Sequence, residues 1–127
     1  MSSTPRPTEL RVSADRRQLS IAFDSGERFD IAAELLRVHS PSAEVQGHSA
    51  GERKLIGGKR GVKISQLVPT GNYAVRIVFD DGHDSGIFTW AYFQEIGKNA
   101  GERLSTYEQQ LAAKGMSRDA VGSKLAN

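Results

Sequence analysis

The sequence contains no cysteine among its 127 residues. Disulfide bonds, thiolate zinc sites and cysteine-ligated iron–sulfur clusters are therefore excluded within this chain. No apolar run approaches the roughly 20 residues that span a bilayer, and residues 1–10 lack the apolar stretch of a secretory signal. We therefore expect a cytoplasmic protein that binds no membrane.

An excess of charge of one sign is also missing. The chain has 17 basic and 15 acidic side chains, which gives a net charge of +2, and residues 1–97 hold twelve of each. Proteins that read nucleic acid usually carry a broad basic field on one face. The sequence therefore predicts no sequence-specific nucleic-acid binding.

No catalytic motif stands in the structural setting that its chemistry needs. The spacing G-x-S-x-G occurs once, at residues 47–51, but a nucleophile elbow stands between a strand and a helix, and residues 42–61 show the periodicity of neither. Gly58-Lys59 is not part of a P-loop, because that motif requires glycine where Arg53 stands and serine or threonine where Arg60 stands. Residues 81–85 include aspartate, histidine and serine, but neighbours in sequence rarely form a triad. We therefore expect a protein that is not an enzyme.

Hydrophobic periodicity predicts a small β-rich α+β domain. Apolar and polar residues alternate over residues 9–31, which indicates an antiparallel meander of three strands. Further alternation predicts a second set of strands with a hairpin turn at Asp80-Asp81-Gly82. Short helices are expected at residues 32–40 and 89–97, where the apolar spacing changes to that of a helix.

The domain organisation is predicted to have three parts: a flexible lead at residues 1–7, a folded domain at 8–97, and a helical, then disordered, tail at 98–127. The tail helix has one narrow apolar stripe, made by Leu104, Tyr107 and Leu111. Gly115 is expected to end this helix, and residues 116–127 show no pattern. Because a short isolated helix is marginal in water, the tail is predicted to be dispensable for folding.

Imidazole and carboxylate groups occur together at the predicted hairpin turn. An Asp81-x-His83 pair could project two ligands to one side of the hairpin, and His39 could complete a zinc or iron site. The simpler interpretation is that Asp81-Gly82 forms the turn and that its acidic side chains are solvated. The spacing matches no established metal signature, so the metal site is kept as an alternative.

A cluster of cations lies in and just after a long connection at residues 42–61, formed by Arg53, Lys54, Lys59, Arg60 and Lys63. Backbone N–H groups and positive charge in such a glycine-rich loop can hold a phosphate or an acidic partner. The alternative interpretation is a solvated loop. We expect at most weak, salt-sensitive binding of polyanions here.

Two segments resemble a known family. Residues 36–45, LRVHSPSAEV, and residues 71–90, GNYAVRIVFDDGHDSGIFTW, are similar to the core motifs of a bacterial domain family named for the N-terminal domain of gamma-butyrobetaine hydroxylase. The similarity covers about residues 8–97. It implies a small β-rich α+β domain, which in gamma-butyrobetaine and trimethyllysine dioxygenases precedes the catalytic jelly roll and is not itself the oxygenase.

The resemblance also indicates which positions bind a metal in the relatives. Relatives bind a structural zinc through three cysteines and one histidine, at positions that correspond here to Ser40, Ser42, Val45 and His83. Serine is a poor zinc ligand and valine is none, so we expect this protein to fold without zinc. Related domains are attached to P-loop ATPases of iron–sulfur cluster assembly.

The resemblance, and the lack of a catalytic motif in its expected setting, favour a non-catalytic binding or adaptor domain with a protein partner and no cofactor. The binding surface is expected where the two motifs meet, at Arg37, His39, His83, Asp84 and Trp90. The alternative is a metal-binding accessory protein of iron–sulfur cluster assembly. It would bind iron or zinc through His39, His83 and Asp81.

Overall fold

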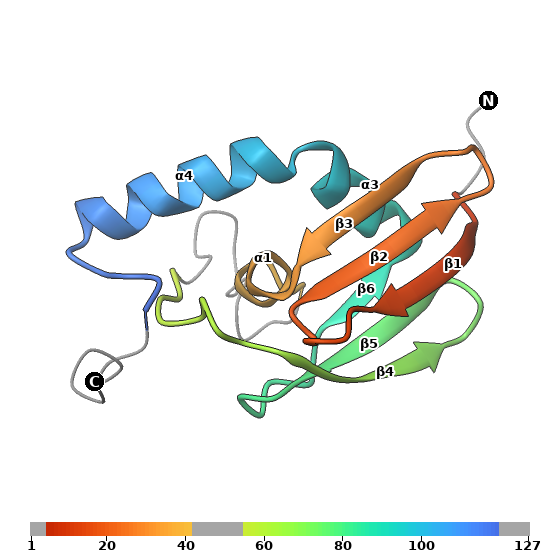
Figure 1. Ribbon diagram of the computed structural model, residues 1–127, viewed down its shortest axis with the longest axis horizontal. Helices are drawn as coiled ribbons and strands as arrows, with labels where there is room; N and C mark the ends of the chain where they lie inside the picture. The colour runs from red at the N-terminus through yellow and green to blue at the C-terminus, as the bar shows by residue number, and fades with distance from the viewer. Residues whose placement is uncertain (1–4, 42–54, 120–127) are drawn as a thin grey trace.

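The computed structural model describes residues 5–41 and 55–119 of the chain (Figure 1). These residues form two three-stranded antiparallel sheets and three helices, which confirms the expected α+β class. The elements in chain order are β1 (Pro7–Val12), β2 (Gln18–Phe23), β3 (Arg28–Ala32), α1 (Ala33–Val38), β4 (Ile64–Thr70), β5 (Ala74–Phe79), β6 (Ile87–Thr89), α3 (Trp90–Lys98) and α4 (Ala100–Ala113).

The first sheet is the meander that the alternating pattern predicts. Its strands follow the order β1-β2-β3, and β2 lies in the middle with Leu19 and Ile21 fully buried. The turn from β2 to β3 ends at Gly26, whose φ of +95° is strained for any residue with a side chain. Leu19 lies opposite Ile31 of β3, so both strands present their apolar residues to the same side.

The second sheet has the order β4-β5-β6, and its central strand β5 is mostly apolar. Val75, Ile77 and Phe79 alternate along β5, and each is at most 2% exposed. The predicted turn follows at Asp80-Asp81-Gly82, where Gly82 has a φ of +94°. The short strand β6 returns from this turn and pairs with β5.

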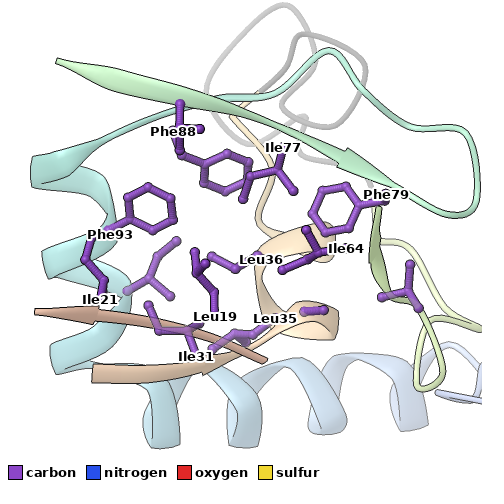
Figure 2. Packing of buried hydrophobic residues seen from close by; sticks show 14 of the residues in the cluster. Leu19, Ile21, Ile31, Leu35, Leu36, Ile64, Ile77, Phe79, Phe88 and Phe93 are labelled. Atoms are coloured by element: carbon purple, nitrogen blue, oxygen red, sulfur yellow. The ribbon is translucent and has the colours of Figure 1, made fainter. Parts of the chain in front are cut away.

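The hydrophobic core lies between the two sheets and is closed by α1 and α3. Figure 2 shows Phe88 and Ile77 of the second sheet facing Leu19 and Ile31 of the first. The N-terminus of α3 is capped by Thr89, whose side chain accepts a hydrogen bond from the Tyr92 N–H at 3.1 Å. This cap fixes the direction in which the chain leaves β6.

Helix α4 is fixed to the domain more firmly than its narrow stripe suggests. Tyr107 and Leu111 are 3% and 2% exposed and pack with Val38 of α1 in a second apolar cluster. The helix ends, as predicted, near Gly115 (φ +68°), and the Met116 N–H donates to the Leu111 carbonyl at 2.8 Å. A glycine directly after a helix can adopt this positive φ, which lets the next N–H bond to a carbonyl of the last helical turn.

Residues 116–119, where the sequence predicts disorder, instead cross back over the domain, and we call them the C-terminal strap. The backbone N–H groups of Gly58 and Arg60 donate to the carbonyls of Ser117 and Arg118 at 2.8 and 2.9 Å. The Arg118 guanidinium donates to both carboxylate oxygens of the buried Glu34 in α1, at 2.6 and 2.9 Å. Residues 120–127 of the predicted disordered tail lie outside the described residues.

No helix in the described ranges is long and apolar enough to cross a membrane.

Candidate functional site

The carboxylate of Asp81 is the centre of a charged cluster at the β5–β6 turn. Its Oδ2 accepts hydrogen bonds from Arg37 at 2.8 Å and from Lys59 at 2.5 Å, and its Oδ1 accepts the His83 backbone N–H at 3.0 Å. Burial raises the pKa of Asp81, but these three donors outweigh it and hold the pKa at about 2. The cluster ties α1 and the segment before β4 to the hairpin turn.

Ser40 and His83 form a buried polar contact beside this cluster. The Ser40 Oγ lies 2.9 Å from the His83 Nε2, and the two residues are 0% and 8% exposed. The contact requires a glycine at position 86, because a Cβ there would lie 2.2 Å from the Ser40 Oγ. The absence of a side chain at Gly86 therefore leaves the space that the Ser40 hydroxyl occupies.

The described residues offer no side-chain group suited to a metal ion. Ser40 and His83 hydrogen-bond to each other, and the resemblance places the other two ligand positions at Ser42 and Val45, which lie outside the described residues. Across residues 5–41 and 55–119, no three histidine, cysteine, aspartate or glutamate side chains are grouped to hold an ion. His39, His83 and Asp81 therefore do not form the alternative iron or zinc site in this structure.

The structure separates the residues of the expected binding surface. Arg37 has an 11% exposed side chain, His83 is buried, and both contact Asp81, so these two residues present little side-chain surface to a partner. His39 is half-buried with its Nδ1 3.1 Å from the Leu35 carbonyl oxygen, while the exposed Asp84 lies 3.6 Å from Arg76. The remaining member, Trp90, lies in a different groove described below.

The predicted anion-binding loop is only partly described, because Arg53 and Lys54 lie outside the described residues. Lys59 pairs with Asp81 and Arg60 pairs with Asp119, the latter at 2.7 Å. The groove at this place, of about 520 Å³, is lined by cations and carboxylates together. Two of the loop's cations are thus matched by acids, which weakens the argument for an anion site.

The Lys63 backbone N–H donates to Asp80 at 2.9 Å, which links the end of the same loop to the hairpin turn. Lys63 itself is exposed.

An aromatic groove lies at the opposite end of β5, where the chain enters the domain. Its volume is about 490 Å³, and its lining comprises Pro5, Arg6, Pro7, Asn72, Tyr73 and Trp90. Tyr73 is 56% exposed, which is the largest exposure among the large hydrophobic residues of the described chain. The alternation at residues 73–79 groups Tyr73 with the buried strand residues, so periodicity alone missed this side chain.

The backbone holds the two aromatic side chains of the groove next to each other. The Trp90 N–H donates to the Tyr73 carbonyl at 3.2 Å, and the Trp90 indole N–H donates to the Asn72 carbonyl at 2.9 Å. On the other side the Trp90 ring stacks on Phe93, with 6.1 Å between the ring centroids. These contacts place the aromatic wall on the rigid frame of β5 and α3.

The fold and the groove together define a small two-sheet α+β domain of the kind that the two motifs predict. A family model described as gamma-butyrobetaine hydroxylase-like, N-terminal, matches residues 10–94. The chain therefore belongs to this family. No curated protein matches the chain.

Solved structures with similar sequences share the fold. Two proteins solved in solution by NMR are 42% and 39% identical to this chain, with TM-scores of 0.81 and 0.80. The alignments cover 94% and 92% of this chain and 89% and 92% of theirs. A crystal structure from Acidithiobacillus ferrooxidans shows a protein of unknown function from the DUF971 family. It is 33% identical with a TM-score of 0.61, over 72% of this chain and 92% of that one.

Proposed function

We propose that the protein is a non-catalytic binding or adaptor domain that contacts a protein partner through the aromatic groove. The observation that carries this proposal is the exposure of Tyr73, at 56%, next to Trp90. Single exposed apolar residues are common, but two large aromatic residues in one open groove are typical of interaction surfaces. Tyrosine, tryptophan and arginine, which all line this groove, are also the residues enriched at energetic centres of interfaces.

The contacts of the side chains that could act in catalysis support a non-catalytic role. Asp81 is bound by Arg37, Lys59 and the His83 backbone, and Ser40 is fully buried against the His83 ring. A nucleophile and base must meet a substrate at an accessible place. Ser40, at 0% exposure, has no such access in this structure.

The rigidity of the groove supports a role in binding. Preorganised side chains lose little conformational freedom when a partner docks, which leaves more of the contact energy for affinity. Trp90 is held by its two N–H bonds and by Phe93. Tyr73 follows the tight turn at Gly71, where a Cβ would lie 2.9 Å from the Tyr73 ring.

A photo-crosslinking experiment in the native cells tests this proposal. A photoreactive phenylalanine analogue replaces Tyr73 in the full chain, and the matched control places it at Gln109, an exposed position on α4. We expect a discrete adduct with one partner protein from position 73 and none from position 109. Equal adduct patterns from the two positions, or no adduct from position 73, would contradict the proposal.

A further inference from the structure

We propose, on the basis of the binding function above, that the occupant of the aromatic groove is an extended peptide segment of the partner with an acidic residue beside a proline or aliphatic residue. The acidic side chain would bind Arg6, and the apolar side chain would pack on Tyr73 and Trp90. The charge of the groove, its shape and its number of cations favour this partner.

The charge of the groove is positive and uncompensated. Arg6 lies on its rim, is exposed, and makes no ion pair with any residue in the described part of the chain. None of the six lining residues is acidic. The Arg6 carbonyl accepts the Asp24 N–H at 2.9 Å, which anchors the backbone that carries the guanidinium. A carboxylate is the natural ligand for such a group, because it pairs with a guanidinium through two parallel hydrogen bonds.

The shape and apolar walls of the groove fit an extended segment. Pro5 and Pro7 line it together with Tyr73 and Trp90. Aromatic-lined grooves bind proline-containing segments because these segments are already extended and lose little entropy on binding. Trp90 uses its indole N–H on Asn72, so the ring offers only apolar surface to a ligand. The volume of about 490 Å³ suits a few side chains rather than a folded domain.

The number of cations distinguishes a peptide from single-stranded nucleic acid. Aromatic platforms also stack bases, but proteins that use them track the phosphates with a continuous basic groove. Here Arg6 is the one cationic residue among the six that line the groove. A single carboxylate satisfies one guanidinium, whereas a nucleic-acid backbone would leave most of its phosphates unpaired.

The test uses the full chain and a displayed library of random dodecapeptides. Trp90 is the only tryptophan of the sequence, so its fluorescence reports directly on occupation of the groove. Each selected peptide is titrated against the native chain, Arg6→Gln, Tyr73→Ala and the control Arg11→Gln. Arg11 is a 69% exposed arginine on β1 that does not line the groove. Circular dichroism confirms that each variant is folded.

We expect selected peptides to share Asp or Glu next to proline or an aliphatic residue and to shift the Trp90 emission. Arg6→Gln should weaken these peptides at least about tenfold, and replacing their acidic residue by its amide should remove the difference between native and Arg6→Gln. Selected peptides that depend on Tyr73 but lack an acidic residue would overturn this inference and leave the binding function standing. The inference would also be overturned if the library yielded no binding peptide, or if the Trp90 emission responded to single-stranded oligonucleotides alone. The crosslink at position 73 separately decides whether the binding function fails with it.

Discussion

Arg118 offers the sharpest test of how the C-terminal strap stabilises the fold. Its guanidinium pairs with both oxygens of Glu34, whose side chain is 6% exposed, while the side chain of Arg118 is 21% exposed. Removing one partner of a buried pair leaves a charge without compensation and costs about 3–5 kcal/mol. Because Arg118 retains some access to water, we expect Arg118→Ala to cost about 3 kcal/mol, at the lower end of that range. In a domain of this size, such a loss lowers the melting temperature by about 10 °C.

The assay is thermal and urea unfolding of the full chain, followed by circular dichroism. Arg60→Ala is the matched control, because Arg60 also pairs with an acid of the strap, but its side chain is 52% exposed and that of Asp119 is 40% exposed. An exposed pair contributes less than about 1 kcal/mol. Replacing Arg118 and Glu34 together by methionine should recover much of the stability, because no buried charge remains. If Arg118→Ala were as mild as the control, the strap would not contribute the stability assigned to it here.

Three further predictions concern the rest of the fold. Truncation after Lys98 should abolish or strongly lower the cooperative melting transition, since it removes α4 and the strap; an unchanged transition would support the dispensable tail that the sequence predicts. Asp81, with a pKa of about 2 against an ordinary 3.8, contributes stability above about pH 4 that is lost as the pH falls toward 2, so Asp81→Asn should flatten the acid limb of the stability curve. Adding a chelator should leave the melting midpoint unchanged, because no metal-binding group of histidine, cysteine, aspartate or glutamate is found among residues 5–41 and 55–119; a large drop would show that a structural metal is bound.

Local sequence features predicted most of the fold. Alternation in β2 and β5 reflects burial of one face of each strand: β2 carries the buried Leu19 and Ile21, and β5 carries the buried Ile77, at the expected spacing. Turn chemistry was equally readable, since Gly82 stands where the hairpin needs a positive φ. These signals depend only on residues a few positions apart, so a single sequence is enough to read them.

Contacts between distant segments could not be read in the same way. Arg118 and Glu34 are separated by 84 positions, and nothing local indicates that a patternless tail will return to α1. Tyr73 shows the complementary problem. It continues the apolar alternation of β5, but it lies one residue before the strand begins, where the core no longer covers it. Periodicity shows which residues share one face of a strand, but it does not show where the core stops covering that face.

The most direct test of the central claim is the dissociation constant of the crosslinked partner, measured through the emission of Trp90 for the native chain and for Tyr73→Ala. We predict that the groove binds the partner and that Tyr73 is an anchor of the contact. Loss of an anchoring aromatic residue costs about 2 kcal/mol or more, so the variant should bind about 30-fold more weakly. Equal dissociation constants for the two proteins would contradict the claim that this groove is where the domain binds.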